Sequence, residues 1–161
     1  FNDSNFPNLN GDLLINCLES FKMPPGRGEI FSLNKFKIID DSYNANPESV
    51  KAALDHLSGF QECRKFFVFG DMKELGVNEE ILHKKVGQYA VGKTDILLTV
   101  GKLAKNAQSN SNNFALSLHF NDNFSLLEKL TELLTDGDII LIKGSRSMQL
   151  DQLIDELKNV K

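Results

Sequence analysis

Cysteine is scarce in this sequence, and no metal-ligand pattern is present. The two cysteines, Cys17 and Cys63, lie far apart, and neither has a histidine at the spacing that metal sites use. Isolated cysteines are typical of proteins from a reducing compartment, where disulfides are rare. The sequence therefore predicts no metal site in this chain and a cytoplasmic location.

Long hydrophobic runs are missing as well. The longest uninterrupted runs, Phe66 to Phe69 and Ile139 to Ile142, contain four residues each. A membrane-spanning helix needs about 20 consecutive apolar residues, and the core of a signal peptide needs about 7 to 15. We therefore expect neither a membrane span nor a signal-peptide core in this sequence.

Positive charge is limited, and arginine is rare. The 18 basic and 22 acidic residues give a net charge of −4, so we expect neither nucleic acid nor a membrane surface as a partner. Only three of the basic residues are arginines, namely Arg27, Arg64 and Arg146. Because a guanidinium group binds carboxylates and phosphates with two parallel hydrogen bonds, the position of each arginine is informative.

The first 25 residues differ from the rest of the chain. The sequence begins with Phe1 and its first methionine is Met23, so we expect the chain to be part of a longer protein. Residues 12–21 have helical periodicity, and two prolines follow them. We expect residues 1–25 to be the end of a preceding domain and residues 26–161 to form the next one.

After residue 25, short apolar stretches alternate with amphipathic ones. The predicted strands are residues 28–33, 36–40, 65–69, 96–100, 115–120 and 138–143, and the predicted helices are residues 47–57, 79–91, 103–108, 124–134 and 149–159. The first two strands flank a tight turn and predict a hairpin. The later apolar runs lack polar alternation, as strands buried on both faces do. This pattern predicts an α/β fold: a Rossmann-like, doubly wound, mostly parallel sheet with helices on both faces and a leading β-hairpin.

Local signals predict where two of the helices begin. Asn46 is a good N-cap for the first helix and Pro47 suits its first position, while Asn78 is the predicted cap of the second helix. Residues 109–113 (SNSNN) predict a short polar loop.

Residues 87–94 match the nucleotide-binding pattern G-x-x-x-x-G-K-[ST] letter for letter. A P-loop follows a strand and opens a helix, so that backbone N–H groups face the phosphates. Here the segment ends a predicted helix and precedes a strand, which favours Gly92 as a helix C-cap. We therefore expect no P-loop at this position.

Three loops are the candidate sites of chemistry. Open α/β sheets bind ligands at the carboxyl ends of their strands, and the loops 41–47, 70–76 and 144–147 are predicted to share that edge. The last of these offers backbone N–H groups, hydroxyl groups and the Arg146 guanidinium to a carboxylate or phosphate. The alternatives are ordinary turn chemistry for each loop and a surface ion pair for Arg146.

A second pattern is similar to that of phosphorelay receiver domains. Asp40 and Asp41 end one strand, Asp71 ends the next and Lys143 ends the last, which would supply an acidic Mg²⁺ pocket with Asp71 as phosphoacceptor. The leading hairpin and the glycine after Lys143 are foreign to receivers. A receiver-like signalling domain is therefore the second hypothesis, and an interaction domain without chemistry is the third.

Five spaced segments carry a more specific resemblance. They are Gly26-Arg27, residues 39–47, Gly70-Asp71-Met72 with Glu74-Leu75-Gly76, Leu82-His83 with Val86-Gly87, and residues 143–146 with Met148. In this order they resemble the C-terminal domain of the Mur ligase family, from about residue 14 to the end. The resemblance implies a three-domain enzyme of cell-wall synthesis. Its N-terminal domain would hold a UDP-sugar peptide, its central domain ATP and Mg²⁺, and this third domain would close over both.

The activity that the resemblance implies is ATP-dependent amide formation. The motifs are most similar to those of family members that join D-alanyl-D-alanine to UDP-N-acetylmuramoyl-tripeptide. The peptide carboxylate would be phosphorylated, the dipeptide amine would attack the acyl phosphate, and ADP and phosphate would leave. ATP and Mg²⁺ would be bound mainly by the central domain. Residues 1–25 would be the tail of that domain, so the isolated chain is expected to be inactive.

The resemblance also assigns four residues to the nucleotide side of the reaction. Arg27 would be catalytic, because it would reach the phosphates once the domains close. Its alternative role is a salt bridge that fixes the interdomain turn. Asp41 would accept hydrogen bonds from the ATP ribose, and Asn44 and Asn46 would lie near the adenine or ribose, with the choice between them left open.

Four further residues are assigned to the incoming dipeptide. Ser145 and Arg146 would hold it by its carboxylate, with Asp71 and Met72 in the loop beside them. Arg64 remains outside the site, at the start of a strand.

Overall fold

The structure, a computed structural model, describes residues 24–159. Its strands are β1 (Glu29–Leu33), β2 (Phe36–Asp41), β3 (Lys65–Gly70), β4 (Ile96–Val100), β5 (Leu116–Phe120) and β6 (Ile139–Lys143). Its α-helices are α2 (Pro47–Ser58), α3 (Glu79–Ala90), α4 (Asn123–Leu133) and α5 (Leu150–Asn159), and its 3₁₀ helices are η1 (Gly76–Asn78), η2 (Ala104–Asn113) and η3 (Arg146–Met148). The helix predicted at residues 12–21 lies outside the described residues.

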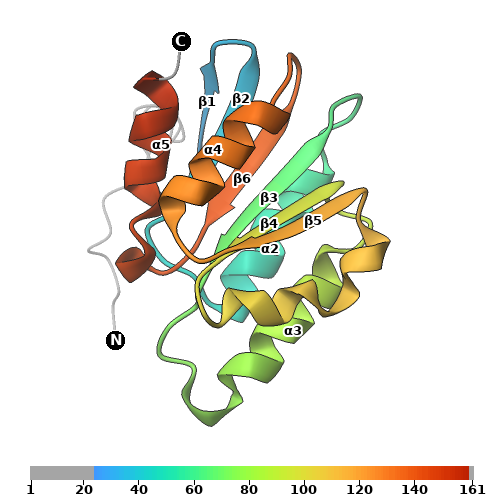
Figure 1. Cartoon of the computed structure of the whole chain (residues 1–161), viewed down its shortest axis with the longest axis vertical. Helices are drawn as coiled ribbons and strands as arrows, with labels where there is room; N and C mark the ends of the chain where they lie inside the picture. The colour runs from blue at the N-terminus through green and yellow to red at the C-terminus, as the bar shows by residue number, and fades with distance from the viewer. Residues whose placement is uncertain (1–23, 160–161) are drawn as a thin grey trace, which may run out of the picture.

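The strands form one sheet in the order β1-β2-β6-β3-β4-β5 (Figure 1). β1 is antiparallel to β2, and every other neighbouring pair is parallel, which confirms the hairpin followed by a parallel sheet. β6, the last strand in the sequence, lies between β2 and β3. The order of the strands in the sheet therefore departs from their order along the chain at β6. Open α/β sheets bind ligands where the strand order reverses in this way.

Helices cover both faces of the sheet, as predicted. α2, α3 and η2 pack on one face, and α4 and α5 pack on the other (Figure 1). Strand β3 serves both cores, because Phe67 and Phe69 belong to the first and Phe66 and Val68 to the second. All four side chains are fully buried, which explains why their run has no polar alternation.

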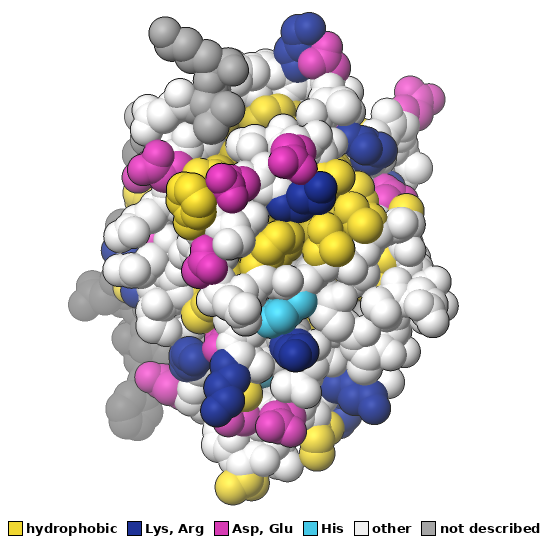
Figure 2. Space-filling view, viewed as in Figure 1, with side chains coloured by type: hydrophobic (Ala, Val, Ile, Leu, Met, Phe, Trp, Pro, Cys, Tyr) yellow, Lys and Arg dark blue, Asp and Glu magenta, His cyan; other side chains and the backbone are white. Residues whose placement is uncertain are grey.

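Some hydrophobic side chains stay visible on the face that α4 and α5 cover (Figure 2). Figure 2 shows hydrophobic side chains over the sheet beside α4, while charged side chains of both signs are interspersed elsewhere on this view. Every residue of the edge strand β5 is only half-buried. Within residues 24–159, none of the helices combines the length and the apolar composition that crossing a bilayer requires.

The predicted cap of α2 is confirmed, whereas Asn78 occupies the N-cap position of α3 without capping it through its side chain. The side-chain oxygen of Asn46 accepts a hydrogen bond from Ser49 N–H at 2.9 Å, and Ser49 Oγ accepts one from Asn46 N–H at 3.1 Å. This reciprocal pair is a capping box that satisfies two N-terminal donors of the helix. Asn78 makes no such bond, because η1 leads directly into α3 and supplies the first turn.

The P-loop-like residues 87–94 have structural roles, as expected. Gly87 lies inside α3, and a Cβ atom there would be 2.0 Å from the carbonyl oxygen of Ala107, so glycine allows η2 to pack directly on α3. Gly92 follows the end of α3 with a φ of 76°, which suits a helix C-cap. The short helix and polar loop predicted for residues 103–113 are corrected: residues 104–113 form η2, with a kink at Asn110.

Candidate functional site

The loops after β2, β3 and β6 meet at the carboxyl edge of the sheet, as predicted. Together they line a pocket of about 370 Å³, which we call the three-loop pocket. Its lining residues are Tyr43, Asn44, Lys73, Glu74, Ser145, Arg146 and Ser147. Three of the predicted site residues, Asn44, Ser145 and Arg146, are thus brought together.

Hydrogen bonds join the β3 loop to the β6 loop at this pocket. Ser145 N–H donates to the carbonyl oxygen of Asp71 at 2.9 Å, and Ser145 Oγ accepts from Lys73 N–H at 2.8 Å. Gly70, which ends β3, and Gly144, which directly follows β6, make this approach possible, since a Cβ atom on Gly144 would lie 3.1 Å from the Cα atom of Gly70. The buried Ser145 therefore holds the two loops at a fixed distance.

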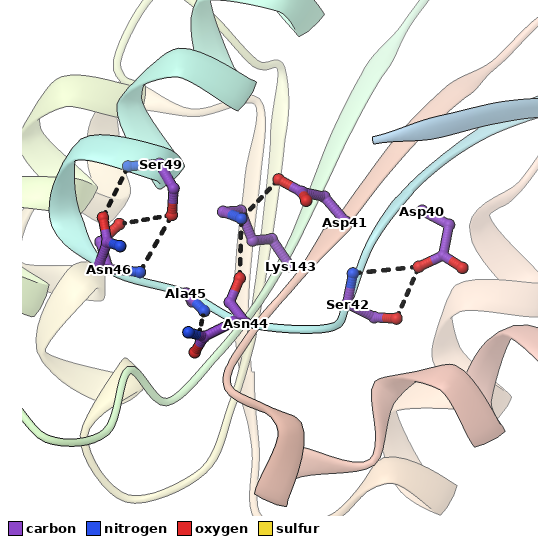
Figure 3. A network of polar contacts seen from close by, with 8 residues as sticks. All are labelled: Asp40, Asp41, Ser42, Asn44, Ala45, Asn46, Ser49 and Lys143. Atoms are coloured by element: carbon purple, nitrogen blue, oxygen red, sulfur yellow. Dashed lines mark hydrogen bonds and ion pairs between the residues drawn. The ribbon is translucent and has the colours of Figure 1, made fainter. Parts of the chain in front are cut away.

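The β2 loop is held by a buried lysine at the end of β6 (Figure 3). Lys143 Nζ lies 2.5 Å from Oδ2 of Asp41 and donates to the carbonyl oxygen of Asn44 at 2.9 Å. Because Lys143 is 1% exposed, the Asp41 carboxylate compensates a charge that burial would otherwise make very unfavourable. Asp41, predicted to bind the ribose, is thus also a structural partner of Lys143.

The structure distinguishes the two predicted nucleotide-binding asparagines. Asn44 lines the three-loop pocket, and its side-chain oxygen accepts a hydrogen bond from Ala45 N–H at 2.8 Å. The Asn46 side chain caps α2 through Ser49, as Figure 3 shows, and does not line the pocket. Position therefore favours Asn44 over Asn46 as a ligand contact.

Two of the three arginines contact the ring of Tyr43. The Arg27 guanidinium carbon lies 4.3 Å from the centre of the Tyr43 ring, and that of Arg146 lies 5.8 Å from it. Such cation–π contacts hold a guanidinium group in place without neutralising it. Among the described residues, Arg27 has no acidic side chain within ion-pairing distance, and the alternative of a salt bridge that fixes the interdomain turn stays a prediction.

Backbone geometry brings Arg27 to this ring. Tyr43 N–H donates to the carbonyl oxygen of Gly26 at 2.9 Å, so the segment before β1 runs beside the β2 loop. Gly26 has a φ of 74°, and a Cβ atom there would lie 3.0 Å from Tyr43 N. Tyr43 was not among the predicted site residues, although an aromatic residue within a polar loop is a signal that the sequence offers.

The alternative role of Arg146, a surface ion pair, is present in the structure. Its Nη1 atom lies 3.0 Å from Oδ2 of Asp151, and the two side chains are 66% and 39% exposed. Ion pairs as exposed as this one contribute little to stability because water screens them. A ligand carboxylate can therefore replace Asp151 without disrupting the fold.

Asp71 has a structural position rather than a pocket position. Its Oδ1 atom accepts hydrogen bonds from the backbone N–H groups of Leu103 and Ala104 at 2.9 and 2.8 Å, and Lys73 Nζ lies 2.9 Å from Oδ2. These bonds fix the start of η2. With the residue 2% exposed, Asp71 joins loops in this structure, and its place beside the dipeptide stays a prediction.

The receiver hypothesis fails on the same observations. A phosphoacceptor carboxylate has to be open to a phosphodonor and to Mg²⁺, whereas that of Asp71 is buried and already hydrogen-bonded. In the part of the chain that the structure describes, no three His, Cys, Asp or Glu side chains gather as a metal site.

Met72 is a core residue, and the predicted place of its loop beside the dipeptide stays a prediction. Its side chain is fully buried in the first core, and its N–H donates to Nε2 of His83 at 2.8 Å. Nδ1 of His83 lies 2.6 Å from the carbonyl oxygen of Glu79, to which it donates. Burial lowers the pKa of His83, so this imidazole is neutral and holds the β3 loop from inside the fold.

The family to which these motifs belong is decided by comparison with known proteins. The profile of the family called Mur ligase, glutamate ligase domain, matches residues 26–146. This chain belongs to the Mur ligase family. The match begins at Gly26 and ends at Arg146, so it includes both arginines that lie at the Tyr43 ring.

Similar curated proteins are UDP-N-acetylmuramoyl-tripeptide–D-alanyl-D-alanine ligases. That of Bacillus subtilis is 38% identical over 128 residues, which cover 74% of this Mur ligase chain and 27% of the relative. That of Escherichia coli is 34% identical over 145 residues, which cover 88% and 31%. The chain thus spans less than a third of the length of these relatives.

Solved structures agree with the fold. A MurF structure from Acinetobacter baumannii superposes with a TM-score of 0.84 at 28% identity, covering 92% of this chain and 34% of that one. MurF ligase from Thermotoga maritima in complex with ADP gives a TM-score of 0.79 at 26% identity, with 90% and 33% covered.

Proposed function

We propose that this chain is the C-terminal domain of a cytoplasmic ligase that joins D-alanyl-D-alanine to UDP-N-acetylmuramoyl-tripeptide, with hydrolysis of ATP to ADP and phosphate. The names of the curated relatives and the fraction of their length that is matched support this assignment. Residues 26–161 form the domain, residues 1–25 end the preceding central domain, and catalysis requires both other domains.

The observation that carries this proposal is the pair of arginines on Tyr43 beside the three-loop pocket. The reaction brings together nucleotide phosphates and the carboxylate of the dipeptide, and both are anions that a guanidinium group binds well. Arg27 stabilises the charge on the transferring phosphoryl group. Arg146 binds the dipeptide carboxylate, with Ser145 beside it at the junction of the β3 and β6 loops.

The nucleotide side of the site lies in the β2 loop. Lys143 donates a hydrogen bond to Oδ2 of Asp41, which orients the carboxylate. The Oδ1 atom is left to accept a hydrogen bond from a ribose hydroxyl group. Asn44 lies next to it in the three-loop pocket. The bound ADP in the Thermotoga maritima relative supports a nucleotide as a ligand of this type of protein.

Mg²⁺ does not fit the residues described here. Residues 24–159 provide no group of three acidic, histidine or cysteine side chains, so the metal and the nucleotide phosphates are held mainly by the central domain. The contribution of this chain is therefore positive charge, orientation of the dipeptide amine toward the activated carboxylate, and closure over the substrates.

The test uses the full-length protein that contains this chain. Incubated with ATP, Mg²⁺, UDP-N-acetylmuramoyl-tripeptide and D-alanyl-D-alanine, it should release phosphate and form the pentapeptide product, and omission of either peptide substrate should stop both. Residues 26–161 alone should do neither. Phosphate release that does not require the dipeptide would overturn the proposal.

A further inference from the structure

Glu74 is a charged residue of the three-loop pocket to which neither the fold nor the proposed reaction gives a role. It is exposed and lines the pocket together with Lys73 and Arg146. Across residues 24–159, no Lys, Arg or His side chain lies within 4.0 Å of its carboxylate, although two cations line the same pocket. The pocket therefore contains an acidic group without a counter-ion.

The backbone places Glu74 close to the junction between the β3 and β6 loops. The hydrogen bond from Lys73 N–H to Ser145 Oγ joins these loops at 2.8 Å, and Glu74 and Arg146 are the residues that directly follow this pair. Glu74 has a φ of 62°, a left-handed conformation that residues with a Cβ atom rarely adopt. Glycine would adopt it freely, so the backbone alone does not explain a glutamate at this position.

The two cations of the pocket differ in how far they are already neutralised. Lys73 Nζ is paired with Asp71, whose side chain is 3% exposed, so this charge is committed to the fold. Arg146 is paired only with the exposed Asp151 and can exchange that partner for a ligand. The pocket thus offers one available guanidinium group and one available carboxylate.

We infer that the three-loop pocket recognises a zwitterion, in which the Glu74 carboxylate binds the free ammonium group of the incoming dipeptide and Arg146 binds its carboxylate. This inference rests on the proposed function and extends it to the amine end of the dipeptide. A free dipeptide carries these two opposite charges at its two ends, which matches the charges that the pocket leaves available. Glu74 therefore selects for a free amine.

The first experiment is Glu74→Gln in the full-length ligase, with the KM for each substrate measured separately. Loss of a hydrogen bond between charged groups predicts a KM for D-alanyl-D-alanine that rises about 10-fold or more, with the KM values for ATP and the UDP-sugar substrate unchanged. The matched control is Glu80→Gln, the same change of charge on an exposed residue of α3 outside the pocket, which should leave all three values unchanged.

A second measurement separates binding of the amine from a general disturbance of the loop. Calorimetric titration should show that the wild-type ligase binds D-alanyl-D-alanine at least about 10-fold more tightly than its N-acetylated form, and that Glu74→Gln binds the two equally. Glu74→Asp, which keeps the carboxylate, should restore part of the preference. Melting curves of all variants should match that of the wild type, because the side chain is exposed.

The outcomes separate this inference from the proposed function. If the wild-type ligase turns over D-alanyl-D-alanine but Glu74→Gln keeps the wild-type KM, or keeps the preference for the free amine, the role of Glu74 is wrong and the proposed function stands. If the wild-type ligase does not use the dipeptide at all, both are wrong.

Discussion

The two edges of the sheet use arginine in opposite ways. At the edge where the parallel strands begin, Arg64 donates two hydrogen bonds to the buried Asp138, from Nε to Oδ1 at 2.9 Å and from Nη2 to Oδ2 at 2.6 Å. It also donates to the carbonyl oxygen of Leu133 and to Thr135 Oγ1. This arginine joins the start of β3 to the start of β6 and to the end of α4.

At the carboxyl-terminal edge, the other two arginines have far fewer partners. Arg27 and Arg146 lie at the Tyr43 ring, and the one ion pair between them and the described residues, from Arg146 to Asp151, is exposed. A guanidinium group whose donors are filled by its own protein builds the fold, and one whose donors are left open can bind an anion. The difference in bonding therefore separates an edge whose arginine is committed to the fold from an edge whose arginines keep donors open.

The largest expected effect is on Arg27. Arg27→Ala in the full-length ligase should lower kcat by about 100-fold to 1000-fold, as the loss of a charge that stabilises a transition state does. The free energy of unfolding should change by at most about 1 kcal/mol, because the residue is exposed, has no ion pair among the described residues and loses only its cation–π contact with Tyr43. Steady-state kinetics and urea unfolding check both values, and an unchanged kcat would remove Arg27 from the mechanism.

Arg64 should behave in the reverse manner. Arg64→Ala leaves the buried carboxylate of Asp138 without its charged partner, so we expect about 2 kcal/mol lower stability with substrate KM values unchanged. Urea unfolding of the variant measures the loss. A stable variant with altered kinetics would contradict the division of the two edges.

Arg146 should show a smaller effect, confined to one substrate. Arg146→Ala should raise the KM for D-alanyl-D-alanine by about 10-fold, because a charge-assisted hydrogen bond to its carboxylate is lost. Binding of the UDP-sugar substrate serves as the control and should be intact. If the KM for the dipeptide is normal, the carboxylate is bound elsewhere.

The smallest expected effect is the pH dependence of stability that His83 causes at the carboxyl-terminal edge. Burial lowers the pKa of His83 in the folded protein, so the unfolded chain takes up a proton at His83 before the folded protein does. The contribution of His83 to stability is therefore complete above its ordinary pKa of about 6.5 and is lost as the pH falls toward the lower pKa of the folded state, with a slope of at most about 1.4 kcal/mol per pH unit.

Urea unfolding between pH 7.5 and 5 measures this dependence, and His83→Gln should reduce it. The remaining slope includes His119, whose pKa burial also lowers. Hydrogen exchange should locate the effect. As the pH falls, the Met72 N–H that donates to His83 should lose protection, so that its exchange rate rises relative to the intrinsic rate of an unprotected amide at the same pH. The backbone amides around Arg64 should keep their protection. Equal acceleration at both edges would contradict a local role.

Much of the fold follows from local sequence signals. The apolar run 66–69 and the N-cap Asn46 each act through their immediate neighbours, so periodicity and capping chemistry suffice to predict a buried strand and the start of α2. The rule that ligands bind at the carboxyl ends of parallel strands also predicted that three loops would share one edge. Local signals do not reveal bonds to distant partners, such as those by which Asp71 accepts hydrogen bonds from Leu103 and Ala104 at the start of η2.

By itself, the sequence determined the α/β class, the order of its elements and the motifs of the Mur ligase family, because these depend on spacing along the chain. The tertiary structure alone decided that Met72 is buried, that Arg27 reaches the Tyr43 ring, and that Glu74 stands in the pocket of Arg146. These positions follow from the insertion of β6 between β2 and β3, which brings together segments that are far apart in the sequence. Arginine is scarce in the sequence, so each arginine was informative, and the packing of the sheet separated Arg64, which holds the fold, from Arg27 and Arg146, which lie at the Tyr43 ring.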